Sequence, residues 1–147
     1  MVCLGNICRS PMAEGILRNR IEQMGLKLIV DSAGTADYHV GEAPDFRAIQ
    51  TLKKNGIDIS DLAARQFSQN DFDEFDWIYV MDRSNLGNVL AMTRNEGDRK
   101  KVQLIMDSVT PGMGRSVPDP YYGDLHGFDQ VFTMLDQAAV SILSRFT

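Results

Sequence analysis

The chain has 147 residues, a formal net charge of −5 and 44% hydrophobic residues, with a sequence pI of about 4.9. This size and composition suit one domain over residues 1–147 with a single hydrophobic core. The acidic balance argues against nucleic-acid binding, and the lack of any run of about eighteen apolar residues argues against a membrane span.

The first eleven residues predict a strand, a tight loop and the start of a helix. Met1–Cys3 is apolar and fits the tail of a buried strand. Ser10 suits the N-cap position of the helix and Pro11 its first turn. Apolar residues then recur at helical spacing as far as Gly25, which can end the helix. These residues are Met12, Ala13, Ile16, Leu17, Ile21 and Met24.

The rest of the chain alternates between expected strands and helices. Short apolar or β-rich runs predict strands at Leu26–Val30, Trp77–Met81 and Val102–Met106. Capping residues and helical spacing predict helices at 45–54, 68–74 and 84–93, and a last helix on the apolar stripe from Phe128 to Leu143. The segments 31–35 and 107–127 are expected to be mostly loop.

This alternation predicts an α/β fold with a parallel sheet covered by helices on both faces. Ligands of such folds bind beyond the carboxyl ends of the strands. The loop after Cys3, the 31–35 loop and the turn at Asp82 all fall at that edge.

The loop after Cys3 carries the most informative pattern, a cysteine six positions before Arg9. Backbone N–H groups in such a loop can converge on an anion beside a helix N-terminus, and an arginine fork matches two phosphate oxygens. Gly5 is expected to permit backbone angles barred to other residues. The same surroundings favour a thiolate, so Cys3 is a candidate nucleophile, with Ser10 placed to hydrogen-bond its sulfur. Taken alone, the spacing also fits a buried cysteine near a surface arginine.

Four segments, in order along the chain, resemble the low-molecular-weight protein tyrosine phosphatase family, its bacterial members above all. They are Val2–Pro11, Asp31–Thr35, Met81–Asn85 and Asp119–Tyr122. The resemblance implies a three-layer α/β/α fold with a central four-stranded parallel sheet and a phosphate-binding loop between the first strand and first helix.

The resemblance also implies roles for individual residues. Cys3 would form a phosphocysteine, Arg9 would hold the phosphoryl oxygens, and Asp119 would serve as general acid and base. Ser32 and Ser10 would brace Asn6 in an unusual backbone conformation. The implied substrate-binding residues are Leu4, Gly5, Asn6, Ile7, Cys8, Ser10, Tyr38 and Tyr121. No metal or cofactor is required.

Several of these residues could instead have purely structural roles. Asp119 could be a turn former between two prolines, and the tyrosines could be surface packing. Asp82 is expected to hold the fold together, through Arg65, rather than touch substrate. Cys8 is either a small buried filler or the partner of Cys3 in a reversible disulfide.

The function expected is hydrolysis of phosphotyrosine in proteins, or of small aryl phosphates, with phosphate or sulfate binding in the loop. Two alternatives are a thiol-coupled arsenate reductase and an inactive phosphate-binding module. The former needs cysteines downstream of Cys8, which the chain lacks, and Ile7 stands where phosphoarginine specialists tend to have threonine. A cytoplasmic monomer or weak dimer is expected, since a thiol nucleophile needs reducing surroundings.

Two departures from the family pattern stand out. Only Met1 and Val2 precede Cys3, whereas relatives have a full central strand there, so we expect the native start to lie upstream. Many relatives carry a histidine about three residues before the arginine that corresponds to Arg65, and here the position holds Leu62. Asn6 is therefore expected to depend more on Ser32.

Overall fold

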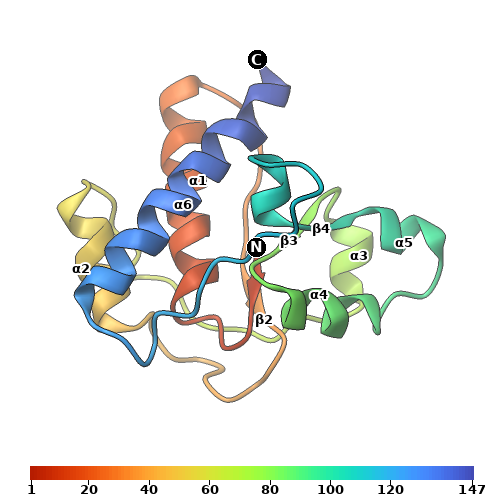
Figure 1. The fold of residues 1–147 in the computed structure, drawn as a ribbon, viewed down its shortest axis with the longest axis horizontal. Helices are drawn as coiled ribbons and strands as arrows, with labels where there is room; N and C mark the ends of the chain where they lie inside the picture. Colours follow the sequence, from red (N-terminus) through yellow and green to blue (C-terminus); the bar gives the residue numbers. More distant parts are fainter.

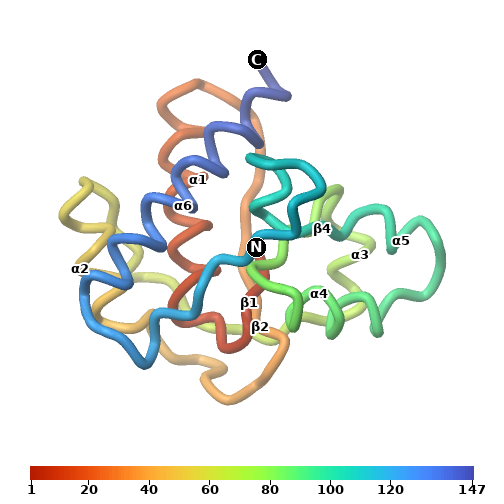
Figure 2. The backbone as a smooth tube through the Cα atoms, viewed as in Figure 1, coloured from red at the N-terminus to blue at the C-terminus, as the bar shows by residue number.

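Four short parallel strands form a sheet in the order β2-β1-β3-β4 at the centre of the protein (Figures 1 and 2). The computed structural model describes all residues from 1 to 147. The strands are β1 (Val2–Cys3), β2 (Ala33–Gly34), β3 (Ile78–Val80) and β4 (Val102–Leu104). Val2 of β1 pairs with Ala33 on one side and with Val80 on the other, which makes β1 a central strand.

Helices lie on both sides of this sheet, which confirms the expected three-layer α/β/α architecture (Figure 1). One side carries α1 (Arg9–Met24), α2 (Phe46–Lys54) and α6 (Leu125–Leu143). The other carries α3 (Asn70–Glu74), α4 (Arg83–Leu90) and α5 (Glu96–Lys100). Two 3-10 helices, η1 (Ile105–Ser108) and η2 (Ser144–Phe146), complete the elements. None of the helices combines the length and apolar character needed to cross a membrane.

Strand alternation divides the core into two clusters. Val2, Ile78 and Val80 face a smaller cluster of 8 buried residues. Cys3 and Tyr79 face a larger cluster of 24, half of which comes from α1 and α6. Because successive side chains of a strand point to opposite faces, Val2 is buried under one layer while Cys3 points to the layer that contains α1.

Most predicted elements are confirmed, with shorter strands than expected. The helix predicted at 45–54 is α2, and Asp45 caps it by accepting a hydrogen bond from the N–H of Arg47. The helices at 68–74 and 84–93 are α3 and α4, and the last helix begins at Leu125. Helix α5 was not predicted, because five polar residues carry no apolar stripe.

The strand predicted at Leu26–Val30 is wrong, because the second strand is Ala33–Gly34. A strand requires a neighbour with which to share hydrogen bonds, and the register pairs Val2 with Ala33. Residues 26–30 therefore lie beside the sheet without joining its ladder, and Leu28 and Val30 only pack against the core.

The first helix begins at Arg9, two residues earlier than expected. Cys8 occupies the N-cap position without a side-chain cap, so Ser10 lies inside the first turn of α1 and is not the N-cap. The Ser10 hydroxyl lies instead 3.0 Å from the sulfur of Cys3. Gly25 does end the helix, in the left-handed conformation with φ 66°.

A cavity of about 470 Å³ lies beside the amino end of β1. Its lining is mostly hydrophobic and includes Met1, Val30, Trp77 and Phe146. The terminal amine of Met1 donates a hydrogen bond to the carbonyl of Asp31 at 3.0 Å. Burial lowers the pKa of this amine to about 6 despite the attraction of nearby carboxylates.

Candidate active site

The first loop, residues 4–8, joins β1 to α1 at the carboxyl edge of the sheet. Its carbonyls are held by the surrounding chain. Leu4 O accepts from the N–H of Ala36 at 2.9 Å, and Ile7 O accepts from the N–H of Asp45 at 2.7 Å. With its carbonyls tied outward, the loop can turn N–H groups towards its own centre, which is the geometry of an anion nest.

Asn6 is the only non-glycine residue with a left-handed backbone, at φ 58°. This is the unusual backbone expected of Asn6. The expectation that Gly5 takes angles barred to other residues is wrong, because Gly5 is not among the residues with positive φ. The glycine that the loop does require is Gly34 of β2. A Cβ there would lie 2.7 Å from Leu4 O and 3.1 Å from the backbone nitrogen of Asn6, so only glycine lets β2 approach this closely.

The sulfur of Cys3 lies inside the first loop and is almost fully buried. The N–H of Asn6 donates to Sγ at 3.3 Å, and the Ser10 hydroxyl lies 3.0 Å from Sγ. A backbone N–H, a hydroxyl and the N-terminus of α1 thus surround the sulfur, which is the setting in which proteins place cysteine nucleophiles.

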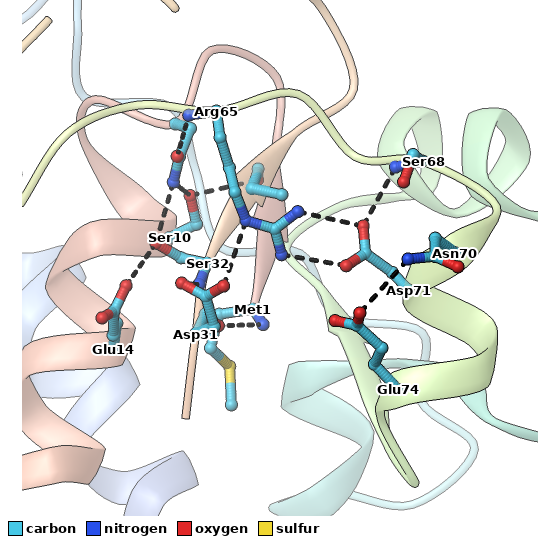
Figure 3. A network of polar contacts seen from close by, with 12 residues as sticks. Met1, Ser10, Glu14, Asp31, Ser32, Arg65, Ser68, Asn70, Asp71 and Glu74 are labelled. Atoms are coloured by element: carbon cyan, nitrogen blue, oxygen red, sulfur yellow. Dashed lines mark hydrogen bonds and ion pairs between the residues drawn. The ribbon is translucent and has the colours of Figure 1, made fainter. Parts of the chain in front are cut away.

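Asn6 is the centre of a buried polar network beneath the loop. Its Nδ2 donates to Ser10 Oγ at 2.7 Å and to Ser32 Oγ at 2.9 Å. Ser32 in turn donates to Glu14 Oε1 at 2.6 Å (Figure 3). Because Asn6 donates to both hydroxyls, their own protons are free to point outward, from Ser32 to the Glu14 carboxylate and from Ser10 to the sulfur of Cys3.

Glu14 forms the far end of that network inside the molecule. Burial raises the pKa of its carboxyl, while the Ser32 hydrogen bond and the charge of Arg18 act in the opposite direction. The side chains of Arg18 and Glu14 also form an ion pair one turn apart on α1. The carboxylate therefore has partners for both its oxygens in an otherwise costly environment.

Arg65 supports the network from the opposite side (Figure 3). Its backbone N–H donates to Asn6 Oδ1 at 3.0 Å. The third hydrogen bond to Asn6 therefore comes from the backbone, in a chain that has Leu62 where many relatives have a histidine. The guanidinium of Arg65 donates two hydrogen bonds to Asp71 and one to Asp31, at 3.0–3.1 Å. Asp82 is not its partner, contrary to expectation.

Asp82 instead binds Arg9, the second residue of the cysteine–arginine pattern. Arg9 is only 3% exposed and donates from Nη1 to Asp82 Oδ2 at 2.7 Å and to Val117 O at 3.0 Å. Its Nη2 lies 3.7 Å from Asp119 Oδ2. The same Asp82 caps α4, so the turn after β3 orients the guanidinium as well as starting a helix.

A second cavity, of about 210 Å³, opens above the first loop. It brings Cys3, Arg9 and Asp119 together from opposite ends of the chain. Asp119 is 40% exposed, and its Oδ1 accepts from the N–H of Tyr121 at 3.1 Å. The complete lining is Cys3, Leu4, Gly5, Ile7, Cys8, Arg9, Tyr38, His39, Asp119, Tyr121 and Tyr122.

Three residues assigned from the sequence lie behind this cavity and not on its wall. Asn6, Ser10 and Ser32 are buried in the network beneath the loop. Two wall residues were missed: His39, expected only at the surface, and Tyr122. No spacing signal distinguishes either of them, although each directly follows a predicted wall tyrosine.

Cys8 lies on the wall of the cavity yet differs from Cys3 in its surroundings. Burial raises the pKa of the Cys8 thiol, and the carboxylate of Asp45 adds to the effect, so Cys8 is a neutral thiol near pH 7. Both cysteines are free. A reversible disulfide between them stays a prediction.

Comparison with known proteins agrees with this arrangement. A family model described as low molecular weight phosphotyrosine protein phosphatase matches residues 1–146. A phosphatase of that name from Schizosaccharomyces pombe is 47% identical over 137 residues, covering 91% of this chain and 86% of the relative. A low molecular weight protein-tyrosine-phosphatase of Streptomyces coelicolor is 41% identical, covering 97% and 89%.

A solved structure is similar over almost the whole chain. It is a protein tyrosine phosphatase from Entamoeba histolytica with Hepes in the active site. The TM-score is 0.92 at 37% identity, and the match covers 99% of this chain and 93% of the other.

Proposed function

This chain belongs to the low molecular weight phosphotyrosine protein phosphatase family, and we propose how its residues carry out that chemistry. The enzyme is a protein tyrosine phosphatase, a hydrolase of phosphoric monoesters. We propose that residues 1–147 act as one phosphatase domain, with Cys3 as nucleophile, Arg9 as phosphate ligand, and Asp119 as acid and base. The observation that supports these roles is that all three line one cavity.

In the first step, the Cys3 thiolate attacks phosphorus in line with the aryl oxygen. A P–S bond forms as the P–O bond to the phenol breaks, and Asp119 gives its proton to the departing oxygen. Arg9 and the N–H groups of the first loop hold the three equatorial oxygens. Positioning and charge stabilisation of this kind account for most of the catalysis of phosphoryl transfer.

In the second step, water attacks the phosphocysteine. The Asp119 carboxylate accepts a proton from the water, the P–S bond breaks, and inorganic phosphate leaves. The Ser10 hydroxyl, 3.0 Å from the sulfur, stabilises the thiolate that departs. No metal or cofactor takes part, since the arginine and the loop supply the positive charge.

The depth of the site supports an aryl phosphate as substrate. Cys3 is 3% exposed at the bottom of the cavity, whereas Tyr38 and Tyr121 at its wall are 72% and 38% exposed. A phenyl ring between the tyrosines carries its phosphate to the sulfur, while the short side chain of phosphoserine does not reach it. We propose phosphotyrosine in proteins and small aryl phosphates as the substrates, with free phosphate or sulfate as loop ligands.

The residues of the site also bear on the cellular compartment, the oligomeric state and the alternative activity. We propose a reducing compartment such as the cytoplasm, because oxidation would consume the Cys3 thiolate. All groups of the site come from one chain, so a monomer or weak dimer is sufficient for activity. An arsenate reductase would need further thiols, and the sequence has no cysteine after Cys8.

The test is turnover of p-nitrophenyl phosphate and of a phosphotyrosine peptide by the wild type and Cys3→Ser. Hydrolysis by the wild type alone, with phosphate trapped on sulfur in a rapid acid quench, is the expected result. Arsenate-dependent thiol oxidation without ester hydrolysis would contradict the proposal. Binding of the peptide without turnover would identify a silent module instead.

A further inference from the structure

Arg47, the second residue of α2, makes a set of contacts that the mechanism above does not use. Its guanidinium donates from Nη2 to Tyr121 O at 2.8 Å and from Nη1 to Gly123 O at 3.0 Å. It also lies over the ring of Phe128, 4.7 Å from its centroid. Helix α2 and the start of α6 lie side by side, so this arginine bridges the gap between them (Figure 1).

The segment that Arg47 holds is the acid loop, residues 118–124, which carries Asp119. Hydrogen bonds inside this loop are local, such as those from the N–H groups of Tyr121 and Gly123 to Asp119 and Pro120. Apart from the N–H of Gly127, which bonds to Asp124 at the end of the loop, the two bonds from Arg47 are the only hydrogen bonds that join residues 118–124 to another part of the chain. Asp119 also lies 3.7 Å from Arg9, but that ion pair is made by the carboxylate, so between its ends the backbone of the loop has hydrogen bonds only to Arg47.

Arg47 is itself held by Asp45, which contacts the first loop. Asp45 accepts from Nε and Nη2 of Arg47 at 3.0 Å in a two-pronged pair, and its backbone N–H donates to Ile7 O at 2.7 Å. Burial opposes ionisation of Asp45, but the hydrogen bonds from Arg47 outweigh it and hold the pKa of that carboxyl below its usual value. Asp45 and Arg47 therefore form an ionised pair held by two parallel hydrogen bonds.

We infer that Arg47 is a positioning residue that fixes the acid loop at a set distance from the first loop, so that the Asp119 carboxyl reaches the leaving oxygen. The inference rests on the proposed role of Asp119. One continuous path carries it: Ile7 to Asp45, Asp45 to Arg47, and Arg47 to the carbonyls on either side of Tyr122. Placing a proton donor within hydrogen-bond range is a matter of tenths of an ångström, which the loop does not guarantee without its two backbone bonds to Arg47.

The leaving group distinguishes this role from a merely structural one. A p-nitrophenolate leaves with little help from a proton, whereas an unsubstituted phenolate needs it. Both substrates are measured on one preparation, so the kcat/KM for p-nitrophenyl phosphate divided by that for phenyl phosphate does not depend on how much enzyme is folded. Loss of proton donation by Asp119 raises this ratio, and loss of folded enzyme leaves it unchanged.

The experiment compares kcat/KM for p-nitrophenyl phosphate and phenyl phosphate in the wild type, Arg47→Met, Arg47→Lys and Asp119→Asn. Arg47→Met keeps a side chain over Phe128 but donates no hydrogen bond, and we expect its ratio to rise about ten-fold. Arg47→Lys, which donates without the planar fork, should show a smaller rise. The matched control is Lys54→Gln, which removes another cation that joins α2 to α6, through Asp129, and should leave the ratio unchanged.

Equal losses on both substrates in Arg47→Met would overturn the inference. So would a further rise in the ratio when Arg47→Met is added to Asp119→Asn, because Arg47 would then act by another route. If Asp119→Asn itself leaves the ratio unchanged, the proposed acid role fails first, and that result is distinct from a failure at Arg47 alone.

Discussion

The two ends of β1 have opposite surroundings. At its carboxyl end, each buried polar side chain of the first loop has a partner, and Asn6 alone makes hydrogen bonds to Ser10, Ser32 and Arg65. At its amino end, an apolar cavity of about 470 Å³ is lined by Met1, whose terminal amine has its pKa lowered to about 6 by burial. The carboxyl end of β1 thus carries a hydrogen-bonded loop with the reactive groups, and its amino end borders an apolar cavity without them.

This difference shows where stability and activity are separated in the molecule. Changes at the carboxyl end should alter turnover more than the free energy of unfolding, because the groups there contact the reacting atoms. Changes at the amino end should do the reverse, since no group in that cavity lines the active-site cavity.

Cys3→Ser is the strongest test at the carboxyl end. Serine can still accept from the Asn6 N–H, so the loop should keep its shape, but its hydroxyl is a far weaker nucleophile. We expect kcat/KM to fall by at least about four orders of magnitude. The melting temperature measured alongside should shift by only a few degrees, and a collapse of the fold would contradict the separation of the two ends.

Asp119→Asn should reduce kcat by about 10²- to 10³-fold, the typical worth of a general acid. Asp119 is 40% exposed, accepts one hydrogen bond, from the N–H of Tyr121, and is 3.7 Å from Arg9, which keeps Asp82 as its partner, so the free energy of unfolding should change little. Steady-state kinetics and urea unfolding of the same preparation check both statements. Asp124→Asn, which lies in the same loop outside the cavity lining, is the control.

Filling the cavity at the amino end of β1 should stabilise the protein. Four apolar, β-prone residues placed before Met1 would enter the cavity beside β1, and an amide would replace the buried amine. We expect the free energy of unfolding to rise by about 2 kcal/mol or more with kcat unchanged. Four Gly-Ser residues in their place are the control for removal of the amine alone, and equal melting temperatures for the two extensions would contradict a role for the cavity.

The same terminus predicts a pH dependence. The amine of Met1 titrates near 6 when folded, against an ordinary value of 8.0, so between these values the unfolded chain binds the extra proton. The free energy of unfolding should therefore fall as the pH drops from 8 to 6, by up to about 2 kcal/mol from this group. Both extensions should flatten that part of the curve, and curves of identical slope would show that the amine does not contribute.

Ser32→Ala should have the smallest effect of the four changes. It leaves one oxygen of Glu14 and one amide proton of Asn6 without a partner, while the other Glu14 oxygen keeps Arg18, so we expect a loss of about 1 kcal/mol in stability. Turnover should fall only a few-fold, since Ser10 and Arg65 still hold Asn6. Ser108→Ala, which removes a local hydrogen bond within η1, serves as the control for loss of a hydroxyl.

Sequence reasoning located the elements better than their ends. The helix predicted at 45–54 matches α2 closely, because Asn55-Gly56 is a local stop signal, but Asp45 is the N-cap and not the first helical residue. The second strand was placed several residues too early, since which residues join a ladder depends on the neighbouring strand. Ser10 was assigned to a cap that it does not make, because its hydroxyl has a better partner in a group seven residues away.

The ion pairs of the charged residues could not be predicted from local sequence patterns either. Asp82 was paired with Arg65, and the structure pairs it with Arg9, while Arg65 binds Asp31 and Asp71. His39 and Tyr122 gave no signal for a place on the cavity wall. Such assignments depend on which loops meet at the edge of the sheet, and sequence spacing does not encode that meeting.

The sequence by itself determined the α/β alternation, the nucleophile with its arginine, and the family, because these depend on local spacing and on motif order. Only the tertiary structure decided how Asn6 is braced, which carboxylate orients Arg9, and how Arg47 joins the acid loop to the first loop. The physical reason is that a hydrogen bond between residues tens of positions apart forms only after the sheet and its covering helices have brought them together.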